Sequence, residues 1–298
     1  IYDYPSEDGT EEKIYKIADI INLSVSRKKN KNSGDNYSLM AGFPNHSYEK
    51  WRDILLKHNY TIVKIEQDSH GTKNPKRKVT EIISPGVNLH SSHYSNYLVS
   101  VYIEEISCNG KHILWGGVSS MDINTGDNII YDIQGVPNDE TYALDEIFRF
   151  IQTYNPREII INTEKISRSK EEIISYLEIG DRNVLYNNYK QKKNLLKINS
   201  IKKLLEKLFP SYGLLDILDY LDLERKLWGM NSYILLLQFV FEHNENIVKN
   251  MKKPIIWDDT NHLILSYDTI NQLNIIQDKT NMNKKLDSVM NLLDNTST

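Results

Sequence analysis

Cysteine and long apolar runs are scarce in this sequence. The single cysteine, Cys108, cannot form a disulfide or a cysteine-based zinc site within one chain. We interpret it as a small, semi-buried apolar residue, and one cysteine fits a reducing intracellular compartment. No segment reaches the roughly 18 apolar residues of a membrane helix, since Gln238 interrupts the apolar run at 235–241. Residues 1–20 are charged and lack a starting Met, so we expect no signal peptide and no membrane partner.

Motifs of common enzyme chemistry are also missing. The chain has no Gly-x-x-x-x-Gly-Lys-Ser/Thr phosphate loop, so we expect no ATP site in it. His90 and His93 form a pair without a third ligand nearby in the sequence, whereas zinc needs three or four. We therefore expect no catalytic residue, no metal site and no bound cofactor within this chain.

The charge balance argues against a general nucleic-acid binder but differs along the chain. The formal net charge is -4. Residues 1–86 hold 14 Lys and Arg against 12 Asp and Glu, a net charge of +2, and the remainder carries -6. Because phosphate contacts come from Lys and Arg, any DNA contact is expected mostly in the first part.

Hydrophobic periodicity predicts a mixed α/β chain. Apolar residues at helical spacing predict helices over residues 11–23, 48–58, 142–154, 170–178, 201–209, 214–221 and 233–241. Alternating or β-branched runs predict strands over residues 60–65, 78–83, 97–103, 113–121, 129–133, 158–162 and 183–186. Three antiparallel strands followed by alternating helix and strand are the order of an RNase H-like layer. In the helix at 142–154 we expect Leu144, Ile147, Phe148 and Ile151 to face the core.

Two polar segments are predicted to lack regular structure. Residues 27–36 contain Lys, Asn, Ser and Gly with almost no apolar residue, which predicts a mobile loop. Residues 84–96 contain Pro85-Gly86 and a Ser/His/Asn cluster with almost no large apolar side chain. We predict a domain linker there, with little reason for its backbone to be buried.

Five short sequence pieces follow one another between residues 39 and 87. They are Met40-Ala-Gly-Phe-Pro-Asn-His46, a helical segment, a strand ending in Glu66-Gln67, Arg77-Lys-Val79 and Ser84-Pro-Gly86. This series resembles the N-terminal domain of the MutS family of DNA mismatch-repair proteins. Each piece alone is a weak signal, but five in the same order and at the same spacing are specific.

The resemblance implies an α/β multidomain fold. It implies a mixed α/β mismatch-binding domain at residues 1–86, a linker at 87–95 and an RNase H-like connector domain at 96–230. Residues 231–298 would begin the helical core, or lever, domain. The Phe-x-Glu wedge of the family is expected upstream of Ile1, and Tyr2 and Tyr4 follow its position rather than replace it.

The resemblance also implies a function for the larger protein. This would be DNA mismatch recognition and repair signalling by a DNA-dependent ATPase that uses ATP and Mg²⁺ outside this chain. The implied partners are mismatched double-stranded DNA, a second copy in a homodimer and downstream repair factors. This chain would supply DNA-backbone contacts and the connector.

The same resemblance points to candidate DNA-binding residues. It implies phosphate contacts from Arg27 and Lys28 and a position at the minor groove for Met40. A second basic cluster, formed by Lys76, Arg77 and Lys78, is the other candidate.

Two alternatives of other classes stay open at this point. The first is an RNase H-fold nuclease with a DNA-binding module, which would need a buried carboxylate cluster to hold two Mg²⁺ ions. Glu104, Glu105 and Asp122 lie at strand ends, where acids are usually solvated. The second is a non-catalytic protein-interaction fragment, which would show an exposed apolar patch on its second domain and no basic face on its first.

Overall fold

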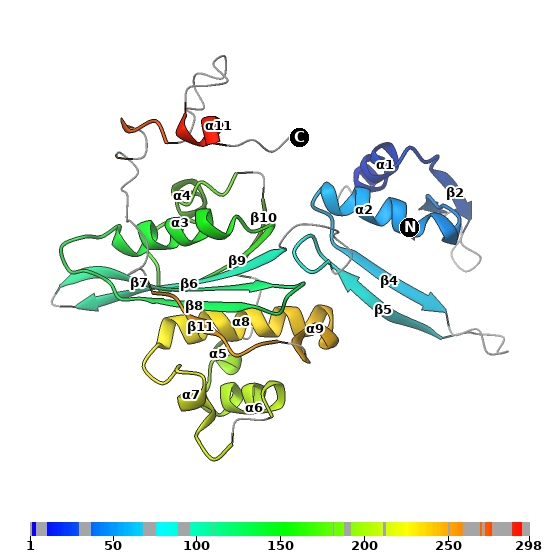
Figure 1. The fold of residues 1–298 in the computed structure, drawn as a ribbon. Coiled ribbons are helices and arrows are strands. Elements are labelled where there is room, and N and C mark those ends of the chain that lie inside the picture. The colour runs from blue at the N-terminus through cyan, green and yellow to red at the C-terminus, as the bar shows by residue number, and fades with distance from the viewer. Residues whose placement is uncertain are drawn as a thin grey trace. The chain divides into compact units, whose positions relative to one another are not determined.

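Contacts divide the chain into two compact units, Ile1–Ile256 and Trp257–Thr298 (Figure 1). The computed structural model describes residues 2–3, 11–29, 37–67, 76–88, 96–108, 110–180, 182–187, 192–210, 213–249, 251–258, 269, 272–275 and 288–293. In the second unit the described part includes a short helix, α11 (Val289–Leu293).

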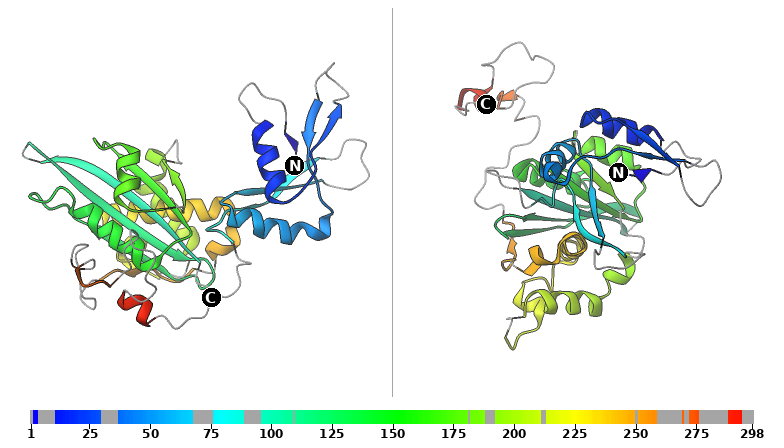
Figure 2. Two further views of the ribbon diagram at one scale, coloured as in Figure 1. Left: turned by 90° about the horizontal axis from the view of Figure 1, so that it is seen from above. Right: turned by 90° about the vertical axis from the view of Figure 1, so that its right-hand side faces the viewer.

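In its described residues, the first part of the larger unit (residues 2–83) contains two small sheets, two α-helices and one 3-10 helix (Figure 2). A three-stranded antiparallel sheet has the order β1-β3-β2, from β1 (Tyr2–Asp3), β2 (Ser26–Lys29) and β3 (Tyr37–Met40). A hairpin pairs β4 (Ile62–Gln67) with β5 (Arg77–Ile83). The helices are α1 (Glu11–Ile20), the 3-10 turn η1 (Asn45–Ser47) and α2 (Tyr48–Lys57).

A small core holds the first sheet against α1. It consists of Ile14 and Ala18 on α1 with Leu39 and Ala41 at the end of β3. Ile14 and Ala18 are four residues apart, so they lie on one face of the helix and meet the strand together. This core explains why α1 forms where the helical spacing of apolar residues predicts it.

The prediction of a mobile loop at 27–36 is wrong for its first residues. Arg27–Lys29 belong to β2 and pair with Tyr37–Leu39 of β3, and residues 30–36 lie outside the described part. Local composition favoured a loop, but the ladder hydrogen bonds to β3 determine the backbone conformation. At the start of α2, the side chain of Ser47 makes no capping hydrogen bond. The 3-10 helix η1 leads directly into α2, and the backbone of Ser47 is not extended (φ -92°, ψ 2°).

The second part is built on a six-stranded sheet of order β10-β9-β6-β7-β8-β11. β6 (Tyr97–Cys108), β7 (Lys111–Asp122) and β8 (Asn128–Ile133) are antiparallel neighbours. β9 (Glu158–Glu164) runs parallel to β6, and β10 (Asn183–Tyr186) runs parallel to β9. The last strand, β11 (Ile255–Ile256), runs parallel to β8.

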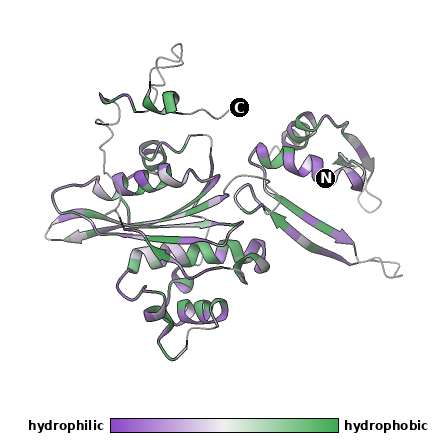
Figure 3. Ribbon diagram, viewed as in Figure 1, coloured by the Kyte–Doolittle hydropathy of each residue, from purple (hydrophilic) through white to green (hydrophobic). Residues whose placement is uncertain are grey.

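Helices cover both faces of this sheet (Figure 1). α3 (Tyr142–Tyr154) and α4 (Lys170–Tyr176) lie on one face. α8 (Leu227–His243) crosses β6, β7 and β8 on the other face. The helices that accompany α8 are α5 (Lys192–Leu195), α6 (Ile198–Leu208), α7 (Ile217–Tyr220) and α9 (Glu245–Lys249). The apolar character of α8 can be followed in Figure 3.

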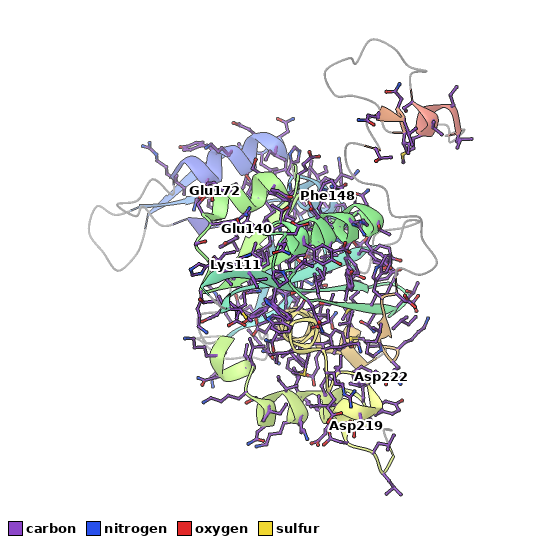
Figure 4. The ribbon with its side chains drawn as sticks, turned by 90° about the vertical axis from the view of Figure 1, so that its left-hand side faces the viewer. Lys111, Glu140, Phe148, Glu172, Asp219 and Asp222 are labelled. Atoms are coloured by element: carbon purple, nitrogen blue, oxygen red, sulfur yellow. The ribbon has the colours of Figure 1, made fainter. Side chains whose placement is uncertain are left out.

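Two sequence predictions about single residues in this part are corrected. Cys108 is exposed rather than semi-buried, because β6 ends there in a tight turn with Gly110 at φ +75°. On α3, Phe148 is only half-buried and Phe150 is buried, whereas Leu144 and Ile147 face the core as predicted. Phe148 can be located on its helix in Figure 4.

The predicted division between residues 230 and 231 falls inside α8. Tyr233, Leu236 and Leu237 on this helix are buried in the same core as Leu98 and Met121 of the sheet. The break in the contacts comes later, after Ile256. The resemblance implied the boundary at residue 230, whereas the helix begins at Leu227 and continues past it.

Candidate nucleic-acid interface

Met40 occupies the middle strand of the first sheet. Its backbone pairs with Tyr2 of β1 on one side and with Ser26 of β2 on the other. Ser26 Oγ donates a hydrogen bond to the Met40 carbonyl oxygen at 3.2 Å. Leu39 before it and Ala41 after it are buried, and Met40 itself is half-buried. Met40 is therefore held in place by the strand ladder and by its buried neighbours.

Arg27 and Lys28 are successive residues of β2, opposite Leu39 and Ser38 of β3. Successive positions of a strand belong to opposite faces of a sheet. Arg27 is exposed, whereas the side chain of Lys28 lies outside the described part. By its backbone, position 28 shares the face of Ser26 and Met40, and position 27 does not.

The second basic cluster lies at the distal end of the β4–β5 hairpin. Lys76, Arg77 and Lys78 are all exposed. Arg77 pairs with Gln67 and Lys78 with Glu66 in the antiparallel ladder. The Glu66 carboxylate makes its ion pair with Lys64 on its own strand at 2.7 Å. The local field at this end of the hairpin therefore favours an anion.

The structure places the two basic clusters in different sheets. Contacts between the sheets run through α1 and α2, since α1 contacts β3 and α2, and α2 contacts β4. The clusters thus belong to one part of the chain but to separate strand ladders.

The turn between β3 and α2 packs through aromatic residues. The Phe43 ring lies 6.3 Å from the Trp51 ring, so the two aromatic side chains join the turn to α2. Pro44 and His46 are exposed. The Lys50 ammonium lies 4.5 Å from the centroid of the Trp51 ring, a cation–π contact that adds a further positive group near the turn. The sequence pattern did not point to Lys50, because a contact between neighbouring residues such as Lys50 and Trp51 leaves no periodic signal.

One face of the hairpin exposes apolar side chains that the sequence analysis did not single out. Val63 and Ile65 on β4 and Val79 on β5 are each about half exposed, at 50%, 58% and 49%. Ile65 and Val79 are direct cross-strand partners. The run Ile62-Val-Lys-Ile65 does not alternate cleanly, so its pattern could not tell which face would be covered.

The acids that the nuclease alternative would need have structural partners. Glu105 accepts a hydrogen bond from the Ser167 amide at 2.6 Å and lies 3.0 Å from His112 Nδ1. Burial opposes ionisation there, but the bonds from Ser167 and the nearby His112 lower the pKa of Glu105. Asp122 accepts from the Asn124 amide at 2.9 Å and so closes the turn between β7 and β8.

No group of three or more His, Cys, Asp and Glu side chains in the described ranges could hold a metal ion. His90 and His93 lie outside those ranges. Nothing in this part of the molecule therefore favours the nuclease alternative. Among the helices of the described residues, none is long and apolar enough to cross a membrane.

Comparison with known proteins adds to this geometry. Residues 12–92, which include β2, β3 and the β4–β5 hairpin, match the family model for MutS domain I. A DNA mismatch-repair MutS homologue of Acanthamoeba polyphaga mimivirus is 33% identical over 273 residues, 82% of this chain and 24% of that protein. The chain belongs to the MutS family.

Further relatives of this MutS-family chain agree with the assignment. The DNA mismatch-repair protein MutS of Caldanaerobacter subterraneus is 28% identical over 267 residues, 87% of this chain and 28% of that protein. The chain thus spans about a quarter of the length of these curated relatives. A solved fowlpox virus Holliday junction resolvase covers 49% of this chain and 99% of its own, with 18% identity and a TM-score of 0.30. That score is too low to assign a fold.

Proposed function

We propose that this chain is the DNA-contacting and connector part of a mismatch-repair protein. The observation that carries the proposal is the match of residues 12–92 to MutS domain I, in the part of the sequence with the positive net charge. The exposed basic residues of this part agree with it, because phosphate contacts supply most of the affinity of a protein for duplex DNA.

In this proposal the candidate residues have distinct roles. Arg27 and Lys28 contact phosphates, and Met40 approaches the minor groove. Lys76, Arg77 and Lys78 form a second set of phosphate contacts. Phosphate contacts set the position of the protein on DNA but carry no sequence information, so these residues would not by themselves recognise a mismatch.

The six-stranded sheet supports an RNase H-like connector. Three antiparallel strands in chain order (β6, β7, β8) are extended on the β6 side by two parallel strands that each follow a helix (β9, β10). This order of elements along the chain is what supports the proposed connector. We place the mismatch-binding domain at residues 1–83, the connector at 84–256 and the start of the core domain at 257–298, because buried residues join 84–88 and 227–256 to the sheet.

The remaining parts of the proposal concern the larger protein. It would be an ATPase that uses ATP and Mg²⁺, forms a homodimer and recruits downstream repair factors after it binds mismatched DNA. A reducing intracellular compartment fits its one free, exposed cysteine.

A DNA titration tests the proposal. This chain should bind duplex DNA weakly, with little preference for a mismatch, and its affinity should fall steeply as salt rises. Fluorescence anisotropy with matched and mismatched duplexes at two salt concentrations measures both properties. Binding that does not depend on salt would contradict the proposed phosphate contacts. A strong mismatch preference would contradict the proposal that this chain supplies mainly phosphate contacts.

A further inference from the structure

Three hydrogen-bond donors surround the buried carboxylate of Glu158, the first residue of β9. Two of them belong to the segment 84–86 and the third is Asn183. Ser84 Oγ donates to Glu158 Oε2 at 2.6 Å. The Gly86 amide donates to the same oxygen at 2.9 Å, and Asn183 Nδ2 donates to Oε1 at 2.7 Å. Glu158 is 0% exposed. A carboxylate removed from water is tolerated only when hydrogen bonds occupy its oxygens, so the acceptor and its donors hold one another in place.

The backbone of Gly86 lies so close to Glu158 that no space is left for a side chain at position 86. A Cβ atom on Gly86 would lie 2.7 Å from both Glu158 Cβ and Glu158 Oε2, and 3.0 Å from a methyl carbon of Leu98. A side chain at position 86 would therefore push the carboxylate away from its donors. The glycine of Ser84-Pro-Gly86 is needed here for contact with β9 and β6, not for turn conformation alone.

Asn96 ties the two ends of the segment between residues 88 and 96 together. Its side-chain Nδ2 donates to the carbonyl oxygens of Gly86 and Asn88, each at 3.2 Å. Asn96 is itself buried and immediately precedes β6. These hydrogen bonds therefore hold Asn88 next to the start of β6.

An apolar anchor completes the attachment. Val87 is buried in the core that contains Leu98 and Met121. Ser84 and Asn88, the first and last residues of the segment 84–88, are also buried. The prediction that the backbone of this stretch has little reason to be buried is thus wrong for residues 84–88. Local composition could not show it, because the acceptor Glu158 is more than 70 residues away in the sequence.

We propose that Glu158 is a positioning residue for DNA binding, which clasps Ser84–Asn88 to the sheet and so limits the freedom of the DNA-contacting part relative to that sheet. The Glu158 clasp, as we name these contacts of Glu158 with Ser84 and Gly86, fixes where the chain leaves β5. The clasp itself is independent of DNA, whereas its effect on DNA binding rests on the proposed function.

Four variants separate positioning from simple loss of stability. Glu158→Met keeps the length of the side chain but has no oxygen to accept hydrogen bonds, and Gly86→Ala pushes the carboxylate away. Glu158→Gln is the conservative variant, because its amide oxygen can still accept from Ser84 and Gly86. Asn183→Ala is the matched control: it removes the hydrogen bond to the same carboxylate from the sheet side and leaves the clasp.

Spin labels on α2 and α3 measure how freely the DNA-contacting part moves relative to the six-stranded sheet. Cysteines replace the exposed residues Glu49 on α2 and Gln152 on α3, in a chain where Ser replaces Cys108. Pulsed electron spin resonance should give a narrow distance distribution for the parent, Glu158→Gln and Asn183→Ala. For Glu158→Met and Gly86→Ala the distribution should be at least about twice as wide, as for a released hinge. Equal widths in all five proteins, or a broad parent distribution, would overturn the proposal.

A DNA titration of the same variants, without labels, tests the link to function. Glu158→Met should weaken duplex binding about threefold or more, because an orientation no longer set in advance must be fixed on binding. Its salt dependence should stay unchanged, since no phosphate contact is lost, and Asn183→Ala should bind like the parent. If Glu158→Met widens the distances but binds DNA normally, the positioning role is overturned. If the parent binds no DNA, the proposed function is wrong. The spin-label distance distributions would still show whether Glu158 holds Ser84–Asn88 on the sheet.

Discussion

Gly117 on β7 lies directly under the backbone of Trp228 at the start of α8. A Cβ atom on Gly117 would be 2.0 Å from the carbonyl oxygen of Trp228 and 2.4 Å from the Gly229 nitrogen. Asp132, the strand partner of Gly117, accepts a hydrogen bond from that Gly229 amide at 2.7 Å. The first turn of α8 is therefore fixed to the sheet by one close approach and one hydrogen bond.

Gly117→Ala should destabilise the chain by about 1–3 kcal/mol or more, because the added methyl group meets backbone atoms that cannot rotate away. Urea unfolding monitored by tryptophan fluorescence measures this change, since Trp115 and Trp228 stack at 4.3 Å beside the site. Gly42→Ala is the control, because a Cβ atom there has nothing within 4 Å. Equal stability of the two variants would mean that α8 does not pack this closely on β7.

Asp132 should make the stability depend on pH. Burial raises the pKa of Asp132 above the ordinary value of 3.8, although the amides of Gly229 and Trp228 oppose the shift. The folded state then holds the proton more tightly than the unfolded state does. The contribution of Asp132 to the unfolding free energy is therefore largest below pH 3.8 and is lost as pH rises through the raised pKa.

Asp132→Asn isolates this effect. Asparagine keeps an oxygen that can accept from Gly229 but does not titrate in this range. The stability of the variant relative to the parent should therefore rise between pH 3.8 and neutral pH. Urea unfolding at a series of pH values measures the difference, and curves that stay parallel over this range would contradict the raised pKa.

Neutralising Arg27 and Lys28 together to Gln should weaken duplex binding and lower the slope of log affinity against log salt by about two, roughly one per phosphate contact. Fluorescence anisotropy over a salt series measures both quantities. Lys197 and Lys203, exposed residues next to and on α6, form the control pair. Lys202 is a poorer control because it pairs with Asp216. Equal losses from the two double variants would place the DNA face elsewhere.

The amides of Gly86 and Val87 should exchange hydrogen slowly. They donate to Glu158 Oε2 and to the Ser84 carbonyl oxygen at 2.9 and 3.1 Å, in a buried segment. We expect protection by a factor of about 100 or more, the range of stable structure rather than of a mobile linker. Exchange measured by nuclear magnetic resonance tests this, with the exposed Gly42 amide as reference. Unprotected amides at 86 and 87 would restore the linker interpretation.

Periodicity alone was sufficient for most regular elements. The predicted helix at 142–154 and strand at 183–186 have the same bounds in the structure, as α3 and β10. In both cases local signals agree with the tertiary environment. α3 is followed by Asn155 in the left-handed conformation and then by Pro156, and β10 contains the strand-favouring residues Val184 and Tyr186. The family could be inferred for a similar reason, because its five pieces are local in the sequence.

The sequence by itself determined where most helices and strands form, the uneven charge and the family, because these depend on neighbouring residues. Only the tertiary structure decided that Arg27–Lys29 form a strand, that α8 belongs to the core of the sheet and that Ser84–Asn88 are buried. Each of these depends on a partner distant in the sequence: β3, the sheet residues beneath α8, and Glu158. A polar segment is stable as a strand or a buried turn only when a partner satisfies its hydrogen bonds. Local composition does not indicate which distant residue that partner will be.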